Sequence, residues 1–185
     1  MNSKSLSKLC LGALTLFGAA VLGEAQIERL TLTQMVSRTD NALIGQIVAS
    51  EVIRIDHPVD GPELYFTQLT VEGNSLENGK FETTVITFAG GFIDDENGVW
   101  NSEAPSAEDT KVGNDVVVFY KHTNNMGGDL EANSLFAAHG GLYRTVDGPS
   151  GKVVLGRGEG YAVSTNIKVQ NLDSRITAIA KLKNK

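Results

Sequence analysis

The feature that most constrains the fold is a long β-branched segment near the start of the chain, NALIGQIVASEVIRID, which spans residues 41–56. Its length and its content of Val and Ile predict a strand, and Gly45 predicts a bulge or a bend within it. A long, bent strand can serve both halves of one sheet, as it does in a small closed or nearly closed barrel. The segment therefore favours a barrel.

The segments that follow supply further strands. In ELYFTQLTVEG, residues 63–73, every second residue from Tyr65 to Val71 falls on one face, which is the period of a half-buried strand. VGNDVVVFYK, residues 112–121, is an unbroken apolar run and predicts a strand covered on both faces. Other expected strands are FETTVITFAG (81–90), LFAAHGGLYRTV (135–146) and KVVLGRGEGYAV (152–163).

Two helices flank the strands. Thr31 and Gln34 have the spacing of a capping box and predict a short N-terminal helix. At the other end, NLDSRITAIAKLK, residues 171–183, carries an apolar stripe and ends in lysines, which suit a helix C-terminus. The predicted fold is mainly β: an OB-like closed or partly open barrel, or alternatively a β-sandwich, with a short N-terminal helix and a C-terminal amphipathic helix. The positions expected in the core are Phe66, Leu69, Val71, Val85, Val116, Val118, Leu142 and Ile176.

The first residues have the pattern of a secretory signal peptide. Lys4 and Lys8 precede an apolar run, and Gly23 and Ala25 stand at the positions where signal peptidase requires small residues. The pattern predicts cleavage before Gln26. The apolar run is short and rich in Gly and Ala, whereas a membrane span needs about 20 apolar residues.

Removal of residues 1–25 would leave one domain, residues 26–185, in the periplasm or outside the cell. The chain's single cysteine, Cys10, would leave with the signal, so the mature chain would have no disulfide and no thiolate nucleophile. The mature chain would carry 14 basic and 21 acidic residues, a net charge of −7. This charge argues against nucleic-acid binding, which needs clustered Lys and Arg. No membrane span is expected in the mature protein.

Residues 90–111 have no period and predict a long loop that is rich in acidic residues. Its candidate calcium ligands are Asp94, Asp95, Glu96 and Asn97. These four residues are consecutive, so in an extended loop their side chains point apart, whereas a calcium loop spaces its ligands at alternate positions. The interpretation we favour is a solvated acidic loop. Trp100 in the same loop is a candidate ligand-binding residue, although a tryptophan there more often holds a loop against its barrel.

No other pattern points to catalysis. The chain's histidines, His57, His122 and His139, lack the close spacing of a zinc site, and no GxSxG elbow is present. GRGEGYA, residues 156–162, is not a dinucleotide fingerprint: its third glycine comes one residue early, Tyr161 stands where that glycine should be, and no helix pattern follows. A glycine-spaced strand explains it. No cofactor is therefore expected.

Several segments together resemble a group of largely uncharacterised secreted bacterial proteins. They are TDNALIGQIV (39–48), LYFTQLTVEG (64–73), VITFAGG (85–91), KVGNDVVVFY (111–120) and NLDSRITAIA (171–180). The chain is also similar to the OB-type barrel of netrin-like and metalloproteinase-inhibitor domains. Those inhibitors bind the protease zinc through an N-terminal cysteine, and Gln26 has no thiol. The resemblance therefore implies fold and export, and it implies nothing about catalysis.

Two classes of function remain open from the sequence. The first is an exported, non-catalytic module that binds a protein or other ligand through its long loops, since recognition commonly sits on loops held by a rigid scaffold. The second is a hydrolase that uses carboxylates of the acidic loop, with or without a metal. The absence of a recognisable nucleophile or metal motif favours the first class.

Overall fold

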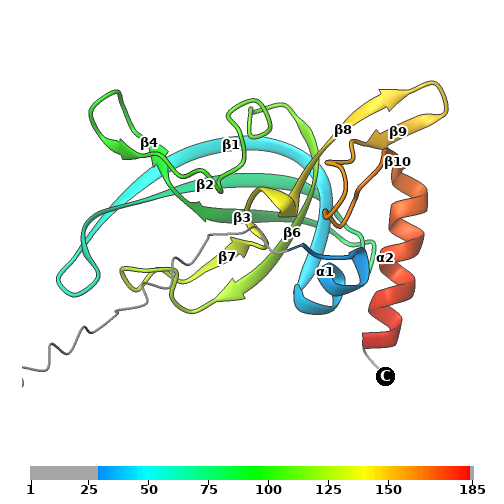
Figure 1. The fold of residues 1–185 in the computed structure, drawn as a ribbon, viewed down its shortest axis with the longest axis horizontal. Helices are drawn as coiled ribbons and strands as arrows, with labels where there is room; N and C mark the ends of the chain where they lie inside the picture. The colour runs from blue at the N-terminus through cyan, green and yellow to red at the C-terminus, as the bar shows by residue number, and fades with distance from the viewer. Residues whose placement is uncertain (1–28, 184–185) are drawn as a thin grey trace, which may run out of the picture.

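The computed structural model describes residues 29–183, and the signal peptide predicted for residues 1–25 lies outside them. The described chain is mainly β, with a closed five-stranded barrel, additional strands outside it and two α-helices (Figure 1). The elements in chain order are α1 (Leu32–Arg38), β1 (Asn41–His57), β2 (Gly61–Ser75), β3 (Phe81–Ala89), β4 (Gly91–Phe92), β5 (Gly98–Val99), β6 (Asp115–Thr123), β7 (Ala132–Leu135), the 3-10 helix η1 (Ala138–Gly141), β8 (Leu142–Gly148), β9 (Gly151–Val154), β10 (Ile167–Lys168) and α2 (Val169–Lys183).

The barrel wall consists of β1, β2, β3, β7 and β6 in that order, and it closes because β6 also pairs with β1. β3 and β7 run parallel, whereas the other neighbouring pairs in the wall run antiparallel. The OB-like closed barrel predicted from the sequence is thus confirmed, and the β-sandwich alternative is wrong.

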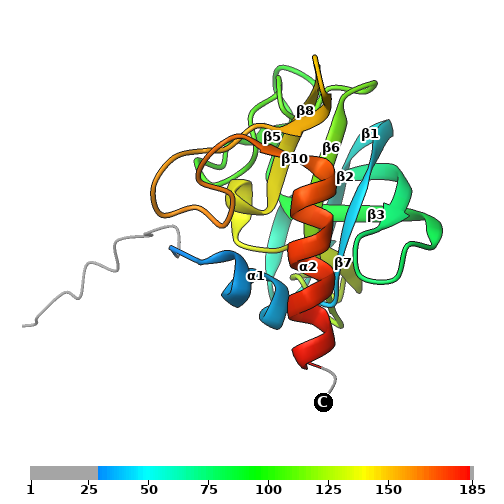
Figure 2. The same cartoon turned by 90° about the vertical axis from the view of Figure 1, so that its right-hand side faces the viewer.

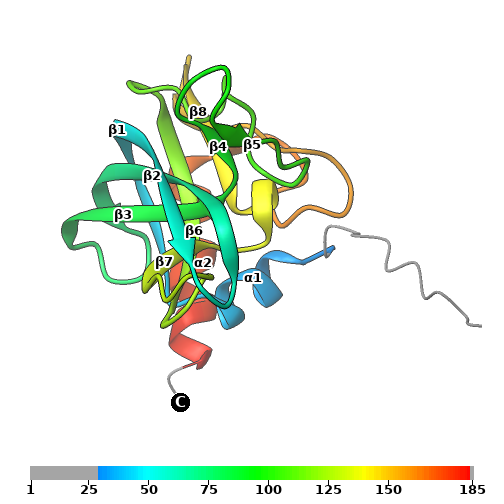
Figure 3. The ribbon, with the colours of Figure 1, turned by 90° about the vertical axis from the view of Figure 1, so that its left-hand side faces the viewer.

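Strand β1 takes part in both halves of the sheet, as its length predicted. Its first residues, Asn41–Gln46, pair with β6, while Leu43–His57 pairs with β2. The pairing is regular at Gly45, and the register shifts between Ile47 and Ala49 instead. The bulge therefore follows the glycine and does not include it. Beyond Ile47, β2 is the one strand partner of β1 within residues 29–183 (Figure 3).

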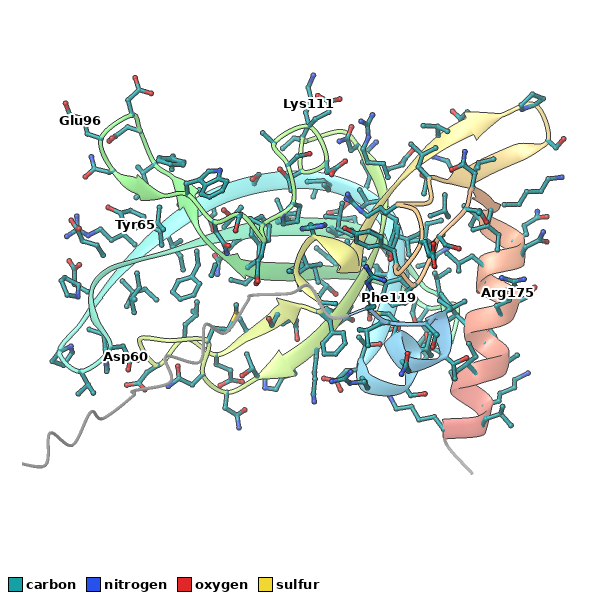
Figure 4. All side chains as sticks on the ribbon, in the orientation of Figure 1. Asp60, Tyr65, Glu96, Lys111, Phe119 and Arg175 are labelled. Carbon is teal, nitrogen blue, oxygen red and sulfur yellow. The ribbon has the colours of Figure 1, made fainter. Side chains whose placement is uncertain are left out.

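Strand β6 contributes side chains to two separate hydrophobic clusters. Val116 and Val118 join a cluster in the barrel interior, while Val117 and Phe119 join a second cluster beneath the helices. Successive side chains of a strand point to opposite faces, so the unbroken apolar run is buried on both sides, as predicted. Phe119 lies between the barrel and the helices (Figure 4).

Seven of the eight predicted core positions are buried, and Val85 is the exception. Val85 is 43% exposed, whereas the next residue, Ile86, is fully buried in the barrel interior. Two adjacent strand residues cannot face the same side, and Ile86 takes the inner one. Phe66 is buried but belongs to neither cluster. Its ring lies beside Gly127, 3.5 Å from where a Cβ on that glycine would stand.

The two helices lie together on one side of the barrel (Figure 2). The side chain of Thr31 accepts a hydrogen bond from the backbone N–H of Gln34, and the Gln34 side chain accepts one from the N–H of Thr31, which confirms the predicted capping box. Helix α2 buries Leu172, Ile176 and Ala180. Within residues 29–183, no helix has the length and hydropathy needed to span a bilayer.

Candidate functional site

The predicted long loop after β3 contains a short hairpin, β4–β5, that stands over one end of the barrel (Figure 3). Gly90 and Gly91 have φ of +94° and +132°, so the chain leaves β3 in conformations that favour glycine. An added Cβ on Gly91 would lie 2.4 Å from the Thr67 hydroxyl oxygen. That hydroxyl donates a 2.7 Å hydrogen bond to the Gly90 carbonyl and fixes the base of the hairpin to β2.

The tip of the hairpin is held by one carboxylate. Asp94 Oδ1 accepts hydrogen bonds from the backbone N–H groups of Glu96 and Asn97 at 2.9 and 2.8 Å. The side-chain amide of Asn97 donates to both oxygens of Asp94, at 2.8 and 2.9 Å. The Glu96 N–H and the Asn97 side chain hold the pKa of Asp94 below its usual range, because they stabilise the ionised form. Asp94 therefore acts as a turn residue.

Of the four calcium candidates, the structure brings Asp94 and Asn97 together as this hydrogen-bonded pair. Asp95 and Glu96 are exposed. Across residues 29–183, no group of three or more His, Cys, Asp or Glu side chains is arranged to hold a metal ion. The carboxylate of Asp94 closes the turn at this tip.

We predict that Asp94→Ala opens the hairpin tip, so that endoproteinase Glu-C cuts after Glu96 several-fold faster than in the wild type. The substitution removes the acceptor of the tip hydrogen bonds, and segments with few hydrogen bonds open at low free energy. Asp94→Asn is the matched control, because its side-chain oxygen can still accept from both backbone N–H groups. Cleavage is followed by mass spectrometry at neutral pH, with and without added calcium, which should change nothing.

The same carboxylate gives the tip a pH dependence of known sign. A lowered pKa means that the stabilisation by Asp94 is present above the pKa of an unfolded aspartate and is lost as pH falls through the lowered folded value. The wild-type tip should thus stay closed at neutral pH. Equal cleavage rates for the wild type and Asp94→Ala would contradict the role of Asp94.

A cleft of about 650 Å³ opens beneath the hairpin at this end of the barrel. Val52, Thr67 and Phe88 line it, and they lie side by side, since Val52 pairs with Thr67 and Thr67 pairs with Phe88. The hairpin forms one wall with aromatic and aliphatic side chains. The other wall is polar and comes from residues 101–110, η1 and the segment after β9.

Trp100 stands at the rim of this cleft with its side chain 74% exposed. It also lines a second hollow of about 500 Å³, which includes Tyr65 and Met126. The interpretation that Trp100 holds the loop against the barrel is therefore wrong. Three further apolar side chains of the hairpin are exposed, and we call the four together the hairpin patch: Phe92, Ile93, Val99 and Trp100.

The polar wall is built from groups that are already paired with one another. Arg157 Nη2 donates to Asp109 Oδ2 at 2.8 Å, and both side chains are largely buried. Arg157 Nε donates to the Leu142 carbonyl at 3.0 Å. This ion pair anchors residues 101–110 to the strand region behind the cleft.

His139 on the same wall is also fully engaged. Its Nδ1 lies 3.2 Å from the Glu103 carbonyl oxygen, and its Nε2 lies 2.9 Å from the Tyr161 hydroxyl. A carbonyl only accepts, so Nδ1 carries the hydrogen and Nε2 accepts from Tyr161. Both ring nitrogens of His139 thus hydrogen-bond to groups of the protein itself. The other two histidines, His57 and His122, lie elsewhere and pair with Asp129 and Glu131.

Comparisons of the chain with protein-family models, curated proteins and solved structures found no match. The site thus rests on its own geometry. Sequence reasoning named Trp100 but missed the cleft, whose lining comes from residues distant in the sequence. One sequence signal could have indicated a binding surface here. Phe92 and Ile93 are adjacent large apolar residues in an otherwise acidic loop, and such residues are uncommon in a loop that only faces water.

Proposed function

We propose that this chain is an exported, non-catalytic β-barrel module that binds a protein or other ligand through the loops at one end of the barrel. The observation that carries the proposal is Trp100, which is 74% exposed at the rim of a 650 Å³ cleft. Large exposed apolar groups next to a concave surface mark binding sites, because the indole loses contact with water when a ligand covers it.

The scaffold supports recognition. The hairpin patch lies on β4, β5 and the residue that follows each of them, and the hydroxyl of Thr67 ties the base of the hairpin to the barrel wall. A surface held in place before binding loses less conformational entropy when the ligand arrives. Export is part of the proposal on the strength of the N-terminal pattern, in which Lys4 and Lys8 precede an apolar run and small residues precede Gln26.

The alternative, hydrolysis by carboxylates of the acidic loop, has less support. A carboxylate that acts as acid, base or nucleophile needs a free oxygen directed at the substrate. Asp109 is the carboxylate that lines the cleft among the described residues, and it is paired with Arg157; Asp94 is bound by donors of its own turn. Their hydrogen bonds hold the walls of the cleft and the hairpin in place.

We predict that Trp100→Ala weakens ligand binding by about 30-fold or more, which corresponds to the 2 kcal/mol of a typical interface hot spot. The mature chain is immobilised and exposed to fractionated cell-envelope and culture-medium extracts, with protein and glycan fractions kept separate. Species retained by the wild type are identified and purified. Each is then titrated into the wild type and into each variant by isothermal titration calorimetry, because Trp100 is the single tryptophan of the sequence and Trp100→Ala has no tryptophan fluorescence to follow.

Phe81→Ala is the matched control. Phe81 is another exposed aromatic residue, 70% exposed at the start of β3, and it does not line the cleft. This variant should retain the same species with unchanged affinity. If every retained species binds Trp100→Ala as well as the wild type, the proposed function is wrong.

A further inference from the structure

Along the edge of β1 beside the cleft, backbone N–H and C=O groups point away from the sheet. The carbonyl of Tyr65 accepts from the N–H of Gly90, so Tyr65 turns its backbone polar groups toward β3 and away from β1. Arg54 lies opposite Tyr65 in a regular antiparallel pair, and therefore its own N–H and C=O point away from β2. The same parity holds for Ser50 and Val52.

No strand receives these outward groups within the described chain. The last backbone bonds on this side of β1 join Ile47 to Gly113 and Asn114. From residue 48 to residue 57, β1 pairs with β2 alone. An unpaired strand edge is a template for an added strand, since its N–H and C=O groups alternate at the spacing of another extended backbone.

This edge and the cleft are continuous. The side chains of Ser50 and Val52 line the cleft, and an added Cβ on Gly91 would lie 2.9 Å from Val52. Residues that oppose each other in an antiparallel pair share a face of the sheet. A strand added to β1 would therefore send the side chains opposite Ser50 and Val52 to the same face, toward the cleft and Trp100.

The charge beside the edge is acidic. Asp95 and Glu96 at the hairpin tip are exposed and form no ion pair in the part of the chain that the structure describes. Glu96 projects from the tip above β1 (Figure 4). The nearby cation, Arg54, is neutralised by Asp56 at 3.1 Å and Glu63 at 3.5 Å. The edge thus favours a partner that carries Lys or Arg.

We infer that the β1 edge and the cleft together bind an extended, basic polypeptide segment, which pairs with Ser50, Val52 and Arg54 as an added strand and places an apolar side chain against Trp100. The inference rests on the proposed function and names its ligand class. The backbone edge recognises the extended polypeptide, the cleft selects the apolar side chain, and the tip carboxylates attract the flanking positive charges.

A second copy of this chain fits the edge less well. Glu51, Arg54 and Asp56 place charges along β1, and charged side chains are a common means of preventing edges from pairing with themselves. Each copy also carries a formal net charge of −6 over its full sequence, so two copies repel.

The test uses peptides selected from a random library on the mature protein, with affinity for the wild type and for Trp100→Ala measured by isothermal titration calorimetry. Each selected peptide is resynthesised with single N-methyl groups along its backbone. N-methylation at alternate positions, those that face β1, should weaken binding about tenfold through the lost hydrogen bond and the added bulk, while the intervening positions should change it less than about twofold. Peptide binding should also slow amide hydrogen exchange at Ser50, Val52 and Arg54.

The outcomes separate the inference from the proposed function. If binding depends on Trp100 but is weakened equally by N-methyl groups at either set of alternate positions, the added strand is wrong and the proposed binding module stands. If no selected peptide depends on Trp100, the inference fails, and the extract experiment alone decides the proposed function. Dimerisation in sedimentation experiments, with protected β1 amides and no peptide present, would assign the edge to a second copy.

Discussion

Gly73→Ala is expected to lower the free energy of unfolding by about 3 kcal/mol, at the upper end of the usual cost of overpacking. An added Cβ on Gly73 would lie 2.0 Å from the Ile44 carbonyl oxygen and 2.4 Å from the Cα of Gly45. Both are backbone atoms of β1, so they cannot move aside without separating β1 from β2 or β6. Urea unfolding of a chain of residues 26–185 measures the loss.

Gly140→Ala is the control for that prediction. Its added Cβ would meet the ring of Tyr161 at 3.5 Å, which is ordinary van der Waals contact, and the change should stay within about 0.5 kcal/mol. Equal losses of unfolding free energy for the two variants would show that the close approach of β1 and β2 at Gly73 does not exclude a side chain there.

Phe119→Ala should lower the free energy of unfolding by about 3–5 kcal/mol, the usual cost of truncating a buried phenylalanine. The side chain is fully buried in the cluster beneath the helices and meets Tyr143 edge-to-face, with ring centroids 6.2 Å apart. Since a domain of ordinary stability has about 5–15 kcal/mol in total, this loss is a large share of it. Thermal and urea unfolding both report it.

Phe81→Ala makes the same chemical change at a residue that is 70% exposed, and it should cost less than about 0.5 kcal/mol. Similar losses at Phe119 and Phe81 would contradict the assignment of the second core. Because Phe81→Ala also serves as the control for binding, one variant relates the stability measurements to the functional ones.

The cleft is built on the barrel wall, and within residues 29–183 none of its lining residues belongs to the helix-covered core. Its floor, Val52, Thr67 and Phe88, belongs to three barrel strands, and its hairpin wall is tied to β2 through Gly90. A change in the helix-covered core should weaken folding without touching the hairpin patch. Folded Phe119→Ala protein is therefore expected to bind as the wild type does.

The sequence determined the elements of this protein because their signals are local. A capping box needs residues three apart, so Thr31 and Gln34 place the start of α1. The alternation in β2 and the continuous apolar run of β6 follow from the two-residue period of a strand. Val85 shows the limit: two adjacent apolar residues cannot both face inward, and periodicity does not say which one does.

The tertiary structure alone decided the candidate site, because each part of it depends on which strands pair. Closing the barrel through β1 and β6 uses one side of β1 up to Gln46, and the side beyond Ile47 pairs with no other strand of residues 29–183. The turn at Gly90 and Gly91 then folds the acidic segment back over that edge. This folding exposes Trp100 above residues that are about 30 to 50 positions earlier in the chain, Val52 and Thr67, a juxtaposition that no local pattern encodes.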